Sequence, residues 1–196
     1  MTIASFTAHT AWPAFLIGGQ KSGKTRRAEQ MARDWLDADA QHEAVYLATG
    51  QAWDAEMRQR IARHQTDRTA RVPGMRTAEA PLHLAQALQS YSQPQTLIVV
   101  DCLTMWLTNW MMPAPESESN QPLALDWQGQ RALFLEVLGQ CPGPVVVVGN
   151  EIGLGVIPMG EQVRAFVDAL GVLNQEVARA CASVTLMAAG LPLALK

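Results

Sequence analysis

The sequence is short of cysteine, of long apolar runs and of net charge, and each shortage argues against a class of protein. Its three cysteines lie far apart and form no CxxC pair, so they give no sign of zinc or dithiol chemistry and fit a reduced, cytoplasmic setting. The formal net charge is −3, so nothing attracts the whole chain to nucleic acid or to an anionic membrane surface. The longest apolar runs, such as Thr96–Val100, fall far short of the roughly 20 residues that span a bilayer. We therefore expect a soluble protein with no nucleic-acid partner and no membrane span.

Enough apolar sequence is present for one hydrophobic core. The chain has 196 residues, of which 48% are hydrophobic and 17% are charged, and this composition is typical of a single folded domain. Residues 1–13 lack a basic segment followed by a long apolar stretch, so they predict a flexible tail and not a secretory signal. The predicted domain then covers residues 14–196.

Apolar runs of strand length alternate along the chain with longer helical patterns. Most of these runs are continuously apolar, which is typical of strands buried on both faces of a parallel sheet. The predicted strands are Ala14–Gly18, Ala44–Ala48, Leu97–Asp101, Val145–Gly149 and Ser183–Ala188. The predicted helices are Gly23–Leu36, Trp53–Thr66, Pro81–Ser90, Cys102–Met112, Leu125–Cys141 and Gly160–Ala182. The order predicts an α/β fold, with a mostly parallel sheet covered by helices on both faces. Residues 67–74 and 113–122 are predicted to be irregular because they contain proline and glycine or several prolines.

A glycine-rich motif follows the first predicted strand. Residues 18–25, GGQKSGKT, satisfy the pattern GxxxxGK[ST] and directly precede a helical pattern, which is the context of a phosphate-binding P-loop. The N–H groups of such a loop and of the helix N-terminus converge on phosphate oxygens. In this motif Lys24 reaches the β- and γ-phosphates, and the hydroxyl of Thr25 is a ligand for Mg²⁺. The sequence therefore predicts a P-loop NTPase-like site for a nucleoside triphosphate.

A P-loop of this kind needs a carboxylate on the metal side, and Asp101 is the candidate. It ends the apolar run 97–101, where a carboxylate is costly unless it meets a metal, a hydrogen-bond donor or water. We predict that Asp101 and Thr25 together bind Mg²⁺. The alternative is a solvated strand end or a helix cap, because aspartate is also a common N-cap residue.

Residues 58–76 form a local cationic segment in an otherwise acidic protein. Six arginines fall in it, at positions 58, 60, 63, 68, 71 and 76, with Asp67 as the only acid. The segment fits a second phosphate-bearing substrate or the triphosphate itself, and a solvated helix face is the alternative. Its histidine, His64, continues the apolar face of Trp53, Met57 and Ile61. Periodicity alone favours a packed histidine, whereas a neutral imidazole beside cations is also a nucleophile for phosphorus.

The motifs in this order resemble the bifunctional adenosylcobinamide kinase / adenosylcobinamide-phosphate guanylyltransferase family of cobalamin biosynthesis. The likeness runs from about Ala14 to the C-terminus. Beside the P-loop it includes YLATG at 46–50, DAEMRQRIARHQTDR at 54–68, RTAEA at 76–80, VVDCLTMWLTN at 99–109, GNEIGLGVIP at 149–158 and RAFVDALGVLNQEVA at 164–178.

The resemblance implies particular roles for residues of this chain. It implies that His64 becomes guanylylated, which displaces the packed-histidine interpretation, and that Lys24 is the other catalytic residue. The nucleotide contacts that it implies are Gly18, Gly19, Gln20, Lys21, Ser22, Gly23, Lys24, Thr25, Ala48, Thr49, Gly50, Gln65, Thr66, Asp67, Arg68, Glu79 and Asp101. It also implies a homotrimer with nucleotide sites near the subunit contacts.

Two reactions on one domain are therefore expected. In the first, ATP or GTP phosphorylates adenosylcobinamide; in the second, GMP passes from GTP through His64 to adenosylcobinamide phosphate and gives adenosylcobinamide-GDP. Two alternatives remain open at this point. One is a monofunctional P-loop kinase for another small alcohol, in which His64 only packs. The other is a GTP-dependent switch that acts through a partner and forms no covalent adduct.

Overall fold

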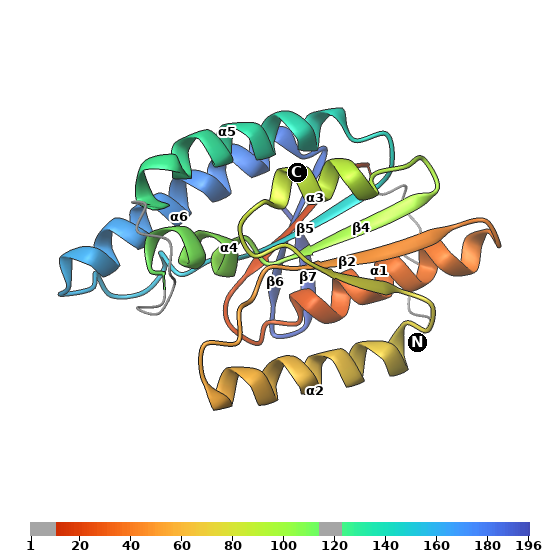
Figure 1. The fold of residues 1–196 in the computed structure, drawn as a ribbon, viewed down its shortest axis with the longest axis horizontal. Helices are drawn as coiled ribbons and strands as arrows, with labels where there is room; N and C mark the ends of the chain where they lie inside the picture. The colour runs from red at the N-terminus through yellow and green to blue at the C-terminus, as the bar shows by residue number, and fades with distance from the viewer. Residues whose placement is uncertain (1–10, 114–122) are drawn as a thin grey trace.

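The computed structural model describes residues 11–113 and 123–196, which form one seven-stranded sheet with helices on both faces (Figure 1). The strands are β1 (Ala14–Gly18), β2 (Glu43–Ala48), β3 (Arg76–Glu79), β4 (Thr96–Asp101), β5 (Val145–Asn150), β6 (Ser183–Ala188) and β7 (Leu191–Ala194). Their order across the sheet is β3-β2-β4-β5-β1-β6-β7. All neighbouring strands pair in parallel except β6 and β7, which are antiparallel. The predicted α/β class with a mostly parallel sheet is confirmed.

The helices divide between the two faces of the sheet. They are α1 (Lys24–Ala38), α2 (Ala55–Arg71), α3 (Leu84–Tyr91), α4 (Leu103–Met111), α5 (Leu123–Gln140) and α6 (Glu161–Ala180). Helices α3 to α6 pack on one face, and α1 with the end of α2 covers the other (Figure 1). Along β4, Ile98 and Val100 point to the first face and Leu97 and Val99 to the second. Asp101 continues the second set, so its side chain belongs to the face of α1 and α2.

Three local expectations need correction or completion. Residues 67–71 were predicted to be irregular, which is wrong, because they form the last turns of α2. The helix ends just before Pro73 and Gly74. These two residues therefore end the helix near the end of the segment 67–74 and not at its start. Strands β3 and β7 are absent from the predicted set because their residues are mostly exposed and give no buried apolar run. Both lie at the edges of the sheet.

Two predicted segments, the tail 1–13 and the loop 113–122, are only partly described. Of the predicted tail, residues 1–10 lie outside the described residues, whereas the carbonyl of Pro13 accepts hydrogen bonds from the N–H groups of Ala182 (2.8 Å) and Ser183 (3.4 Å). Of the predicted loop 113–122, all but Pro113 lies outside the described residues. No helix in the described ranges is long and apolar enough to cross a membrane.

Candidate active site at the carboxyl edge of the sheet

The predicted P-loop joins the end of β1 to the start of α1, as its sequence context requires. Gly18 has φ 155°, and a Cβ atom there would collide with the carbonyl oxygen of Met187. Gly23, the N-cap of α1, has φ 102°, a backbone conformation that side chains with a Cβ rarely adopt. Two glycines of the motif are therefore required by the backbone path of the loop itself.

Lys24 is hydrogen-bonded to residues of the P-loop. Its side chain is buried, and Nζ donates hydrogen bonds to the carbonyls of Gly18 (2.9 Å) and Gly19 (2.7 Å) and to Oγ of Ser22 (3.4 Å). Burial lowers the pKa of Lys24, and the nearby Cys102 and Asp101 oppose this change. The ammonium group is therefore held against the glycine-rich loop, the kind of loop that can bind phosphate groups.

Asp101 and Thr25 lie together, as the sequence predicts. The Thr25 hydroxyl donates to Oδ2 of Asp101 at 2.7 Å, across 76 positions of sequence. The same oxygen accepts a second hydrogen bond, from the Tyr46 hydroxyl at 2.8 Å. Burial, and then the charge of Asp101, raise the pKa of Tyr46 well above its ordinary value, so the phenol stays protonated and remains a donor. Asp101 is thus a hydrogen-bonded carboxylate, and the alternative of a merely solvated strand end is wrong.

The oxygen atoms at this point suit Mg²⁺. Magnesium is usually held by one or two protein oxygens together with nucleotide phosphates and water. Thr25 and Asp101 offer a hydroxyl and a carboxylate at the foot of the P-loop. Within residues 11–113 and 123–196 there is no group of three or more His, Cys, Asp or Glu side chains that would form a metal cage. Thr25 and Asp101 are thus two oxygen donors of the kind that Mg²⁺ uses together with phosphate and water.

Two polar side chains hold together the chain segments that leave this edge of the sheet. Thr49 is fully buried, and its hydroxyl donates to the carbonyl of Cys102 and accepts from the Cys102 N–H, both at 2.7 Å. The amide of Asn109 donates to the carbonyls of Thr49 (2.7 Å) and Pro81 (2.8 Å). These bonds connect the segments that follow β2, β3 and β4. The Thr49 hydroxyl is therefore engaged in this scaffold.

Helix α2 is anchored at its C-terminal half. Arg68 is buried, with Cζ 3.7 Å from the centroid of the Tyr46 ring, and its Nη2 donates to Oγ1 of Thr77 at 2.9 Å. Arg71 binds the buried carboxylate of Glu29 on α1 at 2.8 Å. The sequence placed Arg68 among the nucleotide contacts, but the structure directs its guanidinium onto Tyr46, beside the Asp101 carboxylate.

His64 lies one helical turn before Arg68, on the same face of α2. Four residues of helix place it about 6 Å further toward the start of α2, which is the end that follows the carboxyl edge of β2. His64 is exposed, and Trp53, which the periodicity put on the same packed face, is 38% exposed. The packed-histidine interpretation is therefore wrong for the single chain. The imidazole is accessible on the helix face that reaches the Tyr46–Asp101 pair.

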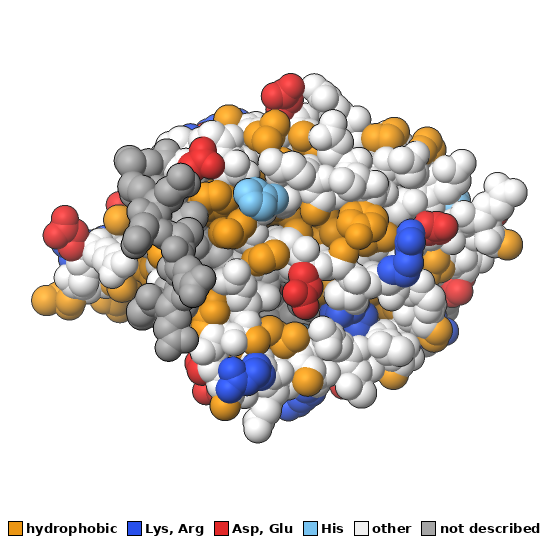
Figure 2. Space-filling view, viewed as in Figure 1, with side chains coloured by type: hydrophobic (Ala, Val, Ile, Leu, Met, Phe, Trp, Pro, Cys, Tyr) orange, Lys and Arg blue, Asp and Glu red, His pale blue; other side chains and the backbone are white. Residues whose placement is uncertain are grey.

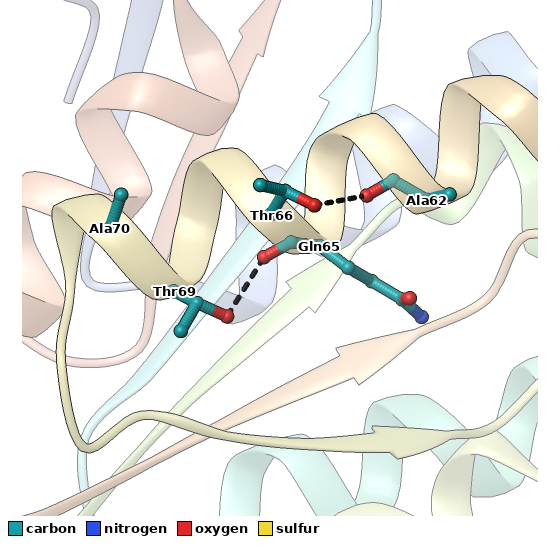
Figure 3. A pocket seen from close by; sticks show the side chains of 5 residues that line it. All are labelled: Ala62, Gln65, Thr66, Thr69 and Ala70. Carbon is teal, nitrogen blue, oxygen red and sulfur yellow. Dashed lines mark hydrogen bonds between the residues drawn. The ribbon is translucent and has the colours of Figure 1, made fainter.

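The residues next to His64 do not all share this face. An open pocket lies along α2, and Figure 3 shows the side chains that line it, which are those of Ala62, Gln65, Thr66, Thr69 and Ala70. The hydroxyls of Thr66 and Thr69 donate to the carbonyls of Ala62 (3.1 Å) and Gln65 (2.9 Å) in the preceding turn. Thr66 is rotated about 200° around the helix from His64, so the structure does not bring its side chain toward the P-loop of the same chain.

Comparison with known proteins identifies the family of the chain. Residues 14–195 match the model of a family described as cobinamide kinase / cobinamide phosphate guanyltransferase. The chain belongs to this family. It is 44% identical over 181 residues to the bifunctional adenosylcobalamin biosynthesis protein CobP of Pseudomonas aeruginosa, covering 92% of this chain and 95% of that protein. It is 33% and 31% identical, over 188 residues each, to the proteins named CobU of Salmonella typhimurium and Escherichia coli, covering 92% of this chain and 98% of theirs.

A solved structure gives a more distant likeness. The flagellar accessory protein FlaH of Methanocaldococcus jannaschii is 12% identical, with a TM-score of 0.47, and the match covers 93% of this chain and 77% of FlaH. This likeness is too weak to bear on function.

Besides Thr49, His64 and Arg68, described above, the predicted site residues of this family member fall into three groups. The residues that come together at the P-loop are Gly18, Gly19, Ser22, Gly23, Lys24, Thr25 and Asp101. Ala48 and Glu79 are register partners at the ends of β2 and β3, with Glu79 exposed and Gly50 just beyond. Gln20, Lys21, Gln65 and Thr66 are exposed, and Asp67 binds Arg71 at 3.1 Å.

Two residues of the site were not predicted. Tyr46 and Asn109 lie inside segments that resemble the family, but neither spacing nor composition gave them a task. A signal was present for Tyr46, because a hydroxyl inside a buried apolar strand needs a hydrogen-bond partner. For Asn109 the comparable signal is an amide inside an apolar helical pattern.

Proposed function

We propose that this edge of the sheet binds a nucleoside triphosphate for two successive transfers to a corrinoid. The observation that carries the proposal is the P-loop centre of Lys24 and the Thr25–Asp101 pair, in a member of the cobinamide kinase / cobinamide phosphate guanyltransferase family whose His64 is exposed on α2. Family membership makes the chain an enzyme of cobalamin biosynthesis with kinase and guanylyltransferase activities. The order of steps, the role of each residue and the adenosylated form of the substrate belong to the proposal.

In the kinase step, ATP or GTP donates its γ-phosphoryl group to the aminopropanol hydroxyl of adenosylcobinamide. The bond from the γ-phosphorus to the bridging oxygen breaks, a bond to the substrate oxygen forms, and the hydroxyl proton is released. Lys24 neutralises charge on the β- and γ-phosphates, and the loop N–H groups bind the same oxygens. Mg²⁺ held by Thr25 and Asp101 supplies further neutralisation of phosphate charge when it is bound. This step needs no protein nucleophile.

In the guanylyl step, a ring nitrogen of His64 attacks the α-phosphorus of GTP. Pyrophosphate leaves, and an N–P bond joins GMP to the imidazole as a phosphoramidate. A phosphate oxygen of adenosylcobinamide phosphate then attacks the same phosphorus, the N–P bond breaks, and adenosylcobinamide-GDP leaves with His64 restored. The exposure of His64 supports this role, because the imidazole must meet two substrates in turn.

We infer further that the enzyme works as a homotrimer in the cytoplasm. Support for assembly comes from the segment between β5 and α6, where large apolar side chains stand exposed: Leu154 at 87%, Val156 at 96%, Ile157 at 78% and Met159 at 95%. Figure 2 shows hydrophobic side chains at the end of the molecule where α6 begins. Such a run is unfavourable in water unless another surface covers it. Sedimentation at micromolar concentration tests the trimer, and a stable monomer would contradict it.

Labelled GTP tests the proposed chemistry directly. Incubation with α-labelled and, separately, γ-labelled GTP, followed by a denaturing gel, should leave only the α label on the protein. The adduct should be labile in acid and stable in base, as a phosphoramidate is. If no α label is retained under turnover conditions, the monofunctional kinase replaces this proposal. Nucleotide-dependent capture of a partner together with slow hydrolysis would favour the GTP switch.

A further inference from the structure

Tyr46 is the one member of the hydrogen-bonded group around Asp101 that the proposed steps leave without a task. It lies on β2, is 5% exposed, and its hydroxyl donates to Oδ2 of Asp101 at 2.8 Å. Thr25 donates to the same oxygen at 2.7 Å. Two donors from two different elements thus converge on one carboxylate oxygen. The carboxylate can rotate freely only if both bonds break.

This arrangement determines the direction in which the hydroxyl oxygen of Thr25 can offer its lone pairs to a metal ion. A hydroxyl that donates its proton to a carboxylate turns its oxygen lone pairs away from that carboxylate. Asp101 must therefore be held still if Thr25 is to offer its lone pairs in a constant direction. The P-loop backbone fixes Thr25 at the start of α1, and Tyr46 fixes Asp101 from the side of the sheet.

The ring of Tyr46 is itself held in place by Arg68. The guanidinium of Arg68 lies over its ring, with Cζ 3.7 Å from the centroid, and is tied to Thr77 on β3. A cation over the ring withdraws electron density from the phenol and strengthens its O–H as a donor. Arg68 is 4% exposed, so little water screens this interaction. The contact also connects α2, which carries His64, to the carboxylate at the P-loop.

We infer that Tyr46 is a positioning residue, which orients Asp101 and through it Thr25 for the metal–nucleotide complex, and that Arg68 holds Tyr46 in that position. This inference rests on the P-loop site of the proposed function but not on the guanylylation of His64. It predicts that Tyr46 influences both transfers, because both use the same triphosphate site. It also predicts that the influence is exerted through metal affinity.

The test is Tyr46→Phe, which removes one hydroxyl and keeps the ring under Arg68. Tyr91→Phe is the matched control, since Tyr91 lies at the end of α3 and is 36% exposed. Mn²⁺ binding is measured by electron paramagnetic resonance in the presence of a non-hydrolysable GTP analogue, so no transfer is needed for the readout. Tyr46→Phe should weaken Mn²⁺ binding about tenfold, the effect of one charge-assisted hydrogen bond. Tyr91→Phe should bind Mn²⁺ as the unmodified protein does.

Activity provides a second measurement. In Tyr46→Phe, the Mg²⁺ concentration for half-maximal rate should rise by a similar factor for both transfers, while the rate at saturating Mg²⁺ largely recovers. Arg68→Lys, which loses the planar group over the ring, should change both quantities in the same direction by a smaller factor. Unchanged Mn²⁺ binding in Tyr46→Phe would overturn the inference, as would a rate defect that Mg²⁺ does not relieve in a protein of unchanged melting temperature. Absence of α label on His64 would instead contradict the guanylyl step and leave this inference standing.

Discussion

The P-loop centre and helix α2 contrast in how completely one chain builds them. At the P-loop, Lys24 is buried and makes three hydrogen bonds, and Asp101 accepts bonds from two elements. On α2 only Arg68 is buried, although the helix has 17 residues, and His64 is exposed. The first region is preorganised, which suits charge stabilisation, whereas the second is accessible, which suits a nucleophile that meets successive partners. We therefore expect a change at His64 to affect GMP transfer alone, and changes at the P-loop to affect both transfers.

The largest effect is expected at the accessible region. His64→Ala removes the only nitrogen nucleophile that the guanylyl step uses, so GMP transfer should fall at least about a thousandfold. Kinase activity should largely persist, because phosphoryl transfer needs positioning and charge stabilisation and no covalent acceptor. Assays of both rates, with α label on the protein as the marker, measure the difference.

The matched control for this change is His83→Ala, because His83 is an exposed histidine at the start of α3. It should alter neither rate. If His64→Ala still forms an acid-labile adduct, the nucleophile is another residue and the separation of the two regions fails.

A smaller effect on both reactions is expected at the preorganised region. Lys24→Ala removes a charge-assisted contact to the triphosphate worth about 1.5 to 3 kcal/mol, which corresponds to roughly 10- to 150-fold in each catalytic efficiency. Both reactions should weaken together, since both place GTP in the same loop. Steady-state kinetics with a melting curve for the variant provide the check. Retention of either activity at its full level would show that the two transfers do not share the loop.

Asp101→Asn sharpens the comparison by addressing the metal alone. The amide keeps the size of the carboxylate and loses its charge, so about a tenfold higher Mg²⁺ requirement is expected, with partial recovery at high Mg²⁺. Asp168→Asn on α6, an exposed aspartate, is the control. Titration of rate against Mg²⁺ makes the measurement. A defect that is the same at every Mg²⁺ concentration, with metal binding intact, would mean that Asp101 serves only the local structure.

The smallest effect is expected at the anchor of α2. Arg71→Ala leaves the buried carboxylate of Glu29 without its partner, so the free energy of unfolding should fall by about 1 to 2 kcal/mol. Arg76→Ala is the comparison, because the Arg76–Glu43 pair is more than half exposed on both sides and should cost less than about 1 kcal/mol. Urea unfolding of both variants measures the two losses in the free energy of unfolding. Equal losses would show that Glu29 is not specifically dependent on Arg71.

Much of the P-loop centre could be predicted because its signals are local. The motif 18–25 predicts a tight turn, a phosphate ligand and the helix that follows. The apolar run before Asp101 predicts a buried strand that ends in a charged residue. The pairing of Thr25 with Asp101 then follows from one rule, that parallel strands bring their carboxyl ends to the same edge. The same local rules also yielded all five of the strands that were predicted.

Helix α2 was predicted less well because its contacts are long-range. Periodicity indicated a helix and an apolar face, yet whether that face is covered depends on elements far away in sequence, and in this chain it is covered only near Arg68 and Val72. Strand β3, which follows α2, has too few apolar residues to be predicted from the sequence. It is stabilised by pairing with β2.

The sequence by itself determined the fold class and, through resemblance, the family, and it predicted the phosphate loop, a metal-side carboxylate and the role of His64. These follow from spacing, from the cost of burying a charge and from motif order, all of which can be read along one chain. The tertiary structure alone decided that Tyr46 and Thr25 share one oxygen of Asp101, that Arg68 covers Tyr46, and that Asn109 joins the segments after β2 and β3. These contacts join residues that are far apart in the chain, so they depend on where folding brings those residues. The strand rule places Thr25 near Asp101, but it identifies neither the shared oxygen nor the other partners.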